Sequence, residues 1–323
     1  MALHRAIDDC DLGAAQRRVP SRVASVRRLA LVLLIMTART ALPGTPTPMH
    51  CWTGDHGNRL YGDSWGDPSA PPVVLLHGGG QTRHSWRHTA RNLARAGFHA
   101  LAYDARGHGD SQWVEDGDYS EAALARDLAC VVRTLAAPPV LIGASMGGLT
   151  SLQAVADGVV EAAALILADV AHRSLGEGVD RVRDFMSRHA RGFVSLEEAA
   201  EAIAGYRGGP RSAKGASGVG KNLRRAADGR LYWHWDPRFL DGRDDLHART
   251  VRLGQCARRI AVPTLVVRGE HSDVLSREAV EEFLVLCPVA TQVEVAGAGH
   301  MLTGDDNDAF GRMAIEFIRR VGG

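Results

Sequence analysis

The sequence predicts an α/β fold, in which a mostly parallel, doubly wound sheet carries an inserted and mainly helical cap. From residue 70 onward, short apolar runs alternate with helical patterns, and several of these runs are apolar on both faces. Strands of that kind are typical of a parallel sheet that helices cover on both sides. The alternation is interrupted once, by a long charged segment. With 323 residues, the chain can bury a large core without disulfides or metals.

The predicted strands and helices follow one another along the chain. Buried strands are expected at 73–76, 98–103, 140–142, 164–167, 264–267 and 291–295. Helices are expected at 120–135, 148–157, 277–286 and 308–321. The last helix is amphipathic and should pack against the sheet.

The interruption defines a candidate cap. About 90 residues lie between the strands that end near Asp169 and begin near Pro263, and a long connection inside a compact domain is usually functional. We therefore expect residues 49–170 and 260–323 to form the core and residues 171–259 to form the inserted cap.

Residues 1–48 are expected to be an extension outside the fold, either disordered or produced by a start codon assigned too far upstream. The apolar run at 29–36 is too short to cross a bilayer, which needs about 20 residues, so no stable membrane insertion is expected. The 28 residues before it are too long a lead for an ordinary signal peptide. We predict a cytoplasmic protein, with secretion as the alternative, and a folded domain that begins near Met49.

Composition excludes several classes of partner. The net charge is +1, but seven arginines in residues 1–48 hide a slightly acidic body, so no basic surface for nucleic acid is expected. The five cysteines are scattered without a C-x-x-C pair, which argues against a disulfide framework and against a zinc site. The oligomeric state stays open.

Residues 143–147 read GASMG and fit the pattern G-x-S-x-G. They follow a predicted strand and precede a predicted helix, which is the context of a nucleophile elbow. The serine of such a turn has a strained backbone, so its neighbours must be small. Ser145 is therefore the candidate nucleophile.

Several motifs occur in the order found in α/β-hydrolases, and the chain resembles that family from about Cys51 to its C-terminus. They are HGGG at 77–80, YDARGHGDS at 103–111, the elbow, GEHSD at 269–273 and GAGH at 297–300. The similarity is weakest in the cap and strongest to the capped esterase, haloperoxidase and epoxide-hydrolase-like group. It implies an α/β-hydrolase fold.

The resemblance implies a catalytic triad of Ser145, Asp273 and His300. A serine hydroxyl needs a histidine to accept its proton, and a carboxylate must orient that histidine. Asp273 and His300 each follow a predicted strand, which places them at the carboxyl edge of the sheet beside the elbow. Asp169, at the end of an earlier strand, is the alternative acid.

The resemblance also implies an oxyanion hole made of two backbone amides. Met146 follows the nucleophile and is one candidate. Gly79 is the other, with Gly80 as its alternative because consecutive glycines leave the register open. Arg106 and His108 are expected to support the scaffold rather than to contact substrate.

The densest aromatic cluster of the cap lies at 232–235 and is followed by Phe239. Packing of the cap on the main domain is its favoured use, and lining of the substrate pocket by Trp233 and Trp235 is the second.

Together these features predict a cofactor-free and metal-free serine hydrolase that cleaves a small or medium carboxylic ester through an acyl-enzyme. The small-molecule ester is the expected partner. Because residue 145 is serine, alkyl-halide and epoxide hydrolysis are disfavoured, since those reactions use an aspartate nucleophile in the family. The same triad could instead serve lactone or carbon–carbon bond hydrolysis, perhydrolysis or acyl transfer. A catalytically silent ligand-binding protein is the alternative of another class.

Overall fold

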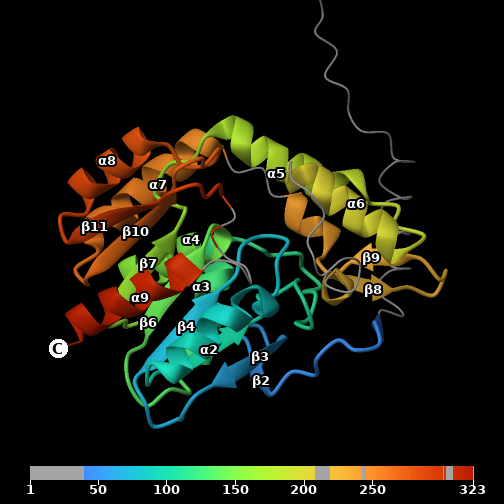
Figure 1. The fold of residues 1–323 in the computed structure, drawn as a ribbon, viewed down its shortest axis with the longest axis horizontal. Coiled ribbons are helices and arrows are strands. Elements are labelled where there is room, and N and C mark those ends of the chain that lie inside the picture. Colours follow the sequence, from blue (N-terminus) through green and yellow to red (C-terminus); the bar gives the residue numbers. More distant parts are fainter. Residues whose placement is uncertain (1–39, 208–218, 242–244, 301, 303–307, 323) are drawn as a thin grey trace, which may run out of the picture.

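The computed structural model describes residues 40–207, 219–241, 245–300, 302 and 308–322. At its centre lies an eight-stranded sheet with the order β11-β10-β7-β6-β4-β5-β3-β2 (Figure 1). Six of its strands run parallel: β4 (Pro72–Leu76), β5 (His99–Tyr103), β6 (Val140–Ala144), β7 (Ala164–Ala168), β10 (Thr264–Gly269) and β11 (Ala290–Val295). These are the six predicted strands, and the predicted α/β class is confirmed. The expectation that residues 291–295 are buried is wrong, because β11 is an edge strand and is largely exposed.

Two further strands were not predicted. They are β2 (His50–Thr53) and β3 (Arg59–Trp65), which pair antiparallel with each other, while β3 pairs antiparallel with β5. Both carry polar and partly exposed residues at the edge of the sheet. An apolar run therefore does not mark them in the sequence.

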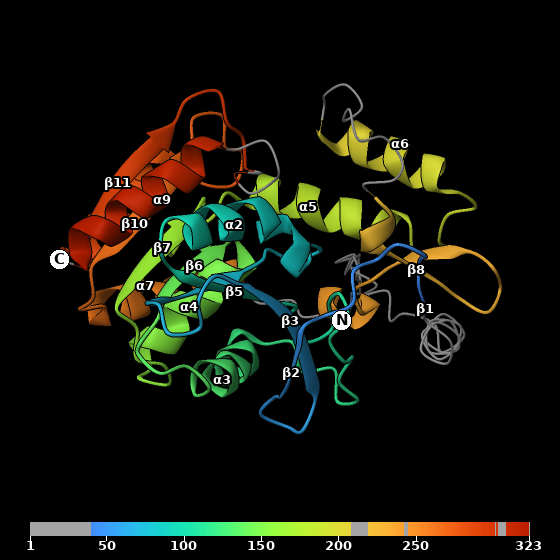
Figure 2. The ribbon, with the colours of Figure 1, turned by 60° about the horizontal axis from the view of Figure 1, so that its bottom comes forward.

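Helices cover both faces of the sheet (Figure 2). One face carries α2 (Arg87–Arg95) and α9 (Asp308–Val321), packed on a core that includes Val73 and Leu75. The other face carries α3 (Glu121–Val132), α4 (Met146–Ala156), α7 (Leu246–Arg259) and α8 (Arg277–Leu286), packed on a core that includes Val74 and Leu76. The alternation along β4 follows from the period of two residues in a strand.

The cap lies beyond the carboxyl ends of the parallel strands (Figure 1). It consists of α5 (Gly176–Arg188), α6 (Leu196–Arg207), η3 (Gly220–Asn222), β8 (Leu223–Arg225), β9 (Leu231–Trp233) and η4 (Pro237–Leu240). Two features differ from the expectation. A short antiparallel sheet accompanies the helices, and α7 packs against α4 and α8, so it belongs to the core rather than to the cap.

The expected start of the fold near Met49 is too late. Residues 40–41 form β1 (Thr40–Ala41), which pairs antiparallel with β8, so the cap sheet has the order β1-β8-β9. Leu42 is buried in the apolar core of the cap. The predictions made for residues 1–39 lie outside the described residues. Among the described helices, none has the length and apolar character required to cross a membrane.

The loop after β5 is held by buried ion pairs. Arg106 is fully buried and donates from Nε and Nη2 to the Asp127 carboxylate at 2.6 and 2.8 Å. Arg83 is equally buried and binds the carboxylates of Asp63, Asp104 and Asp110. Arg106 therefore supports the loop, as expected.

Candidate active site

Ser145 lies on a sharp turn between β6 and α4, at φ 45° and ψ −114°. A non-glycine residue in this region stores about 1–3 kcal/mol of backbone strain. Steric crowding explains why the first and last positions of the motif are glycines. A Cβ on Gly143 would come within 2.4 Å of the Gly148 nitrogen, and one on Gly147 within 2.4 Å of the Leu76 oxygen. The turn thus presents Ser145 at the carboxyl edge of the sheet.

His300 is bound by Asp169, the residue that follows β7. Its Nδ1 lies 2.7 Å from Asp169 Oδ2. The Asp169 side chain is 0% exposed and accepts two further hydrogen bonds, from the Gly269 amide at 2.9 Å and from Ser272 Oγ at 2.5 Å. These three donors satisfy the hydrogen-bonding capacity of the buried carboxylate and hold it in one orientation. The alternative acid of the sequence analysis is thus the one beside His300.

The expectation that Asp273 orients His300 is wrong for this structure. Asp273 lies four residues beyond the end of β10, and its carboxylate binds Nη1 of Arg181, on cap helix α5, at 2.5 Å. The Asp273 side chain is 37% exposed. By contrast, β7 lies between β10 and β6 in the sheet, so Asp169, which directly follows β7, reaches the site. The intervening turn carries Asp273 past His300 to the cap.

The loops that carry Ser272 and His300 are fixed to each other. The Gly297 amide donates to Glu270 Oε2 at 2.7 Å, and the His271 amide donates to the Ala298 oxygen at 2.8 Å. Gly269 permits this contact, because a Cβ there would lie 2.5 Å from the Gly299 oxygen. The histidine loop is therefore held in place.

The amides on both sides of Gly79 are already engaged. The Gly78 amide donates to Gln81 Oε1 at 3.0 Å, and the Gly80 amide donates to His108 Nε2 at 3.2 Å. Met146 is the first residue of α4, where a backbone amide has no acceptor within the helix. Gly79 and Met146 therefore remain the candidate oxyanion donors, and the alternative Gly80 is disfavoured.

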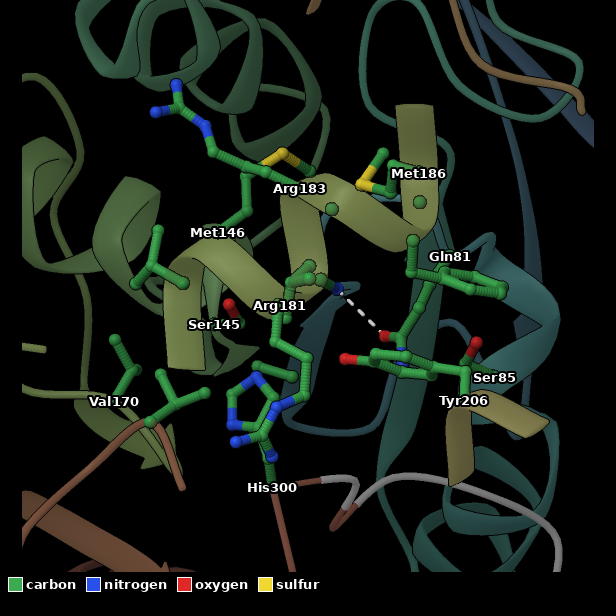
Figure 3. A pocket seen from close by; sticks show the side chains of 18 of the residues that line it. Gln81, Ser85, Ser145, Met146, Val170, Arg181, Arg183, Met186, Tyr206 and His300 are labelled. Atoms are coloured by element: carbon green, nitrogen blue, oxygen red, sulfur yellow. Dashed lines mark hydrogen bonds between the residues drawn. The ribbon is translucent and has the colours of Figure 1, made fainter. Parts of the chain in front are cut away.

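A cavity of about 1510 Å³ lies between the cap and the core. Ser145 and His300 line it, and Figure 3 shows their side chains in this pocket together with Arg181 from α5. Trp233 and Trp235 also line it, stacked at 4.9 Å between ring centroids. Both tryptophans belong at the same time to the apolar core of the cap. Packing and pocket lining are thus combined in the same side chains.

A group of buried histidines was not predicted. His77, His108 and His234 are fully or almost fully buried beside residues 78–80, and their rings follow one another at 5.3 and 5.8 Å. Burial lowers the pKa of each of them, that of His108 to about 3. The motif HGGG at 77–80 could have indicated that His77 belongs to this loop. No residue pattern around His234 indicates that this cap residue lies beside it.

The fold and this site define a class of protein. Residues 73–312 match the alpha/beta hydrolase family, and the chain therefore belongs to that family.

Relatives within the family are known by sequence and by structure. An esterase of Mycobacterium tuberculosis, Rv0045c, is 34% identical over 274 residues, which cover 80% of this chain and 84% of the relative. A crystal structure of the M. tuberculosis esterase Rv0045c superposes with a TM-score of 0.66 at 25% identity, covering 90% and 96% of the two chains. E-2-(acetamidomethylene)succinate hydrolase shares the fold with a TM-score of 0.71 at 22% identity, covering 87% and 100%.

Proposed function

We propose that this protein is a cofactor-free serine hydrolase that cleaves small or medium carboxylic esters through an acyl-enzyme. One observation carries the proposal: Ser145 stands on a strained turn in the same pocket as His300, whose ring is held by the buried Asp169. The similarity to an esterase over 80% of the chain supports the ester as the substrate.

The contact of His300 with Asp169 supports a role as the general base. Because Nδ1 faces the Asp169 carboxylate, the ring carries its proton on Nδ1 and offers Nε2 to the serine. Nε2 accepts the proton of Ser145 as Oγ attacks the ester carbonyl. The Gly79 and Met146 amides stabilise the oxyanion that forms.

The second half of the reaction returns the enzyme to its starting state. His300 gives the proton to the departing alkoxide, which leaves as an alcohol while Ser145 keeps the acyl group. Water then loses a proton to His300 and attacks the acyl carbon. The acid departs, and the proton returns to Ser145.

The proposal is tested by covalent labelling. We expect a fluorophosphonate to modify Ser145 once per chain and to block turnover of a chromogenic short-chain ester. Peptide mapping by mass spectrometry identifies the labelled residue. Labelling of another serine, or ester turnover that persists after complete labelling of Ser145, would contradict the assignment.

We expect Trp235→Ala to change which esters are preferred. The substitution widens the pocket beside Gly80, where Trp235 lies close enough to contact an added Cβ at 3.5 Å. The ratio of kcat/KM for a bulky acyl ester to that for a short one should rise. Each additional substrate methylene that the widened pocket can hold contributes about 1–3 kcal/mol to transition-state binding. Steady-state kinetics on an acyl-length series measures this ratio.

Trp52→Ala is the matched control, since Trp52 lies on β2 at the far edge of the sheet and outside the pocket. It should leave the ratio unchanged. An equally flat ratio for Trp235→Ala would restrict this tryptophan to packing within the cap.

A further inference from the structure

The loop that carries Gly79 is contacted by a side chain from the cap. His234 lies in the short segment between β9 and η4, more than 150 residues away in sequence, and is 0% exposed. Its ring packs against that of His108 at a centroid distance of 5.8 Å. The cap therefore reaches below the pocket surface, to the backbone that forms the oxyanion hole.

The hydrogen bonds of His234 define its tautomer. The Gly109 amide donates to Nδ1 at 2.7 Å, so Nδ1 carries no proton. A neutral ring then has its proton on Nε2, which lies 3.3 Å from the Gly80 oxygen. His234 thus donates to the carbonyl of Gly80 and accepts from the loop after β5.

Two more histidines hold the same loop from the core. His77 Nδ1 donates to the Gly78 oxygen at 2.9 Å, while its Nε2 accepts from the Ala105 amide at 3.0 Å. His108 Nε2 accepts from the Gly80 amide, and its Nδ1 lies 3.2 Å from the Arg106 oxygen. The two peptide groups that flank Gly79 are therefore bound by His77 and His108. His234 binds the following peptide group, at the Gly80 oxygen.

The segment that carries His234 is itself anchored to the core. The Asp236 amide donates to the Gly107 oxygen at 2.8 Å, and Trp113 Nε1 donates to the His234 oxygen at 3.2 Å. Gly80 has φ +73°, and an added Cβ would lie 3.1 Å from Met186 Cε of α5. This glycine allows the cap to approach the oxyanion loop closely.

We propose that His234 is a positioning residue of the oxyanion hole, which makes the cap a partner in ester hydrolysis and not merely a wall of the substrate pocket. By binding the Gly80 carbonyl, His234 holds the peptide group after Gly80 and so restrains the loop on the side opposite to His77. The Gly79 amide lies between these two restraints, and their joint action keeps it directed at the oxyanion. The inference rests on the proposed function.

Two substitutions separate the two bonds of the ring. His234→Asn places an oxygen near the position of Nδ1 and retains the acceptor for Gly109, but it cannot reach the Gly80 carbonyl. His234→Gln places its amide NH₂ near the position of Nε2 and retains that donor. If the bond to Gly80 positions the oxyanion hole, the asparagine variant must lose more activity.

We expect His234→Asn to lower kcat about 10- to 100-fold with KM little changed, because misplacing one oxyanion donor weakens interactions made in the transition state. His234→Gln should recover most of that loss. Dividing kcat by fluorophosphonate-titrated sites removes the contribution of unfolded molecules. Tyr232→Phe is the control. Tyr232 lies two residues before His234, and the substitution deletes its hydrogen bond to Asp228 within the cap, so kcat should stay near that of the wild type.

Equal kcat per titrated site in the asparagine and glutamine variants, or a change confined to the melting temperature, would overturn the proposal. A second measurement needs no substitution. In ¹⁵N-histidine NMR of the wild-type protein, His234 should be the neutral Nε2–H tautomer, and an Nδ1–H tautomer would overturn the proposal. If the wild-type protein did not hydrolyse esters at all, that result would instead contradict the proposed function.

Discussion

Asp169→Asn is expected to lower kcat by about 10⁴-fold without unfolding the protein. An amide in place of the carboxylate can donate to His300 Nδ1 and so stabilises the tautomer that has its proton on Nε2, where the serine proton must go. The loss should therefore fall on kcat rather than on KM. Steady-state kinetics with a chromogenic ester measures it, and circular dichroism checks the fold.

Asp273→Asn is the matched control, since it makes the same chemical change in the neighbouring loop. It removes the charge that binds Arg181, in an exposed ion pair of the kind that contributes about 0–1 kcal/mol. Turnover should stay within about tenfold of the wild type, far from the loss expected at Asp169. The reverse order of the two effects would return the acid to Asp273.

Ser145→Ala and His300→Ala are each expected to lower kcat by about 10⁶-fold, because members of a triad act as a unit. The serine supplies the attacking oxygen, and the histidine takes its proton, so neither group retains its role without the other. The double variant should be no slower than either single variant.

Independent roles would give a different pattern. If the fold-losses of the two single variants multiplied in the double variant, His300 would act elsewhere than on Ser145. The comparison is made with the same ester and with kcat in place of kcat/KM, so that changes in substrate binding do not enter.

The central fold could be predicted from the sequence because five of its six parallel strands are buried on both faces, while β11 at the edge is largely exposed. Each of these five strands is a short apolar run, and its length together with the flanking loops favours a strand over a helix. The antiparallel strands β2 and β3 lack this signal, because both carry polar and partly exposed residues among the apolar ones. The fold class therefore follows from the interior strands of the sheet, whereas the antiparallel pair at one edge could not be predicted.

The acid could not be chosen by local pattern. Asp169 and Asp273 both come shortly after buried strands, and the loop around Asp273 has the more familiar residues. The choice depends on the path of the turn after β10, which presents Ser272 to Asp169 and turns Asp273 to Arg181 of the cap. This path is set by contacts between segments that are about 100 residues apart in sequence. A short stretch of sequence does not contain both partners of such a contact.

His234 was missed for the same physical reason. It stands among aromatic residues whose apparent use is packing, and its buried bond joins it to Gly80 across 154 positions of sequence. Ser145, by contrast, was found because its whole requirement is local: a strand, a strained turn and small neighbours.

The strand β1 gives the cap a third connection to the core. An inserted cap is tied to its core by the two ends of the insertion and can tilt about them as a hinged flap. Here the segment 42–49 makes a third tie between the cap sheet and β2, with a reach of at most about 28 Å when extended. It contains three prolines, and Arg83 Nη2 donates to the oxygen of one of them, Pro46, at 3.3 Å. This third connection means that a large tilt of the cap would have to break the pairing of β1 with β8 or the bond between Arg83 and Pro46.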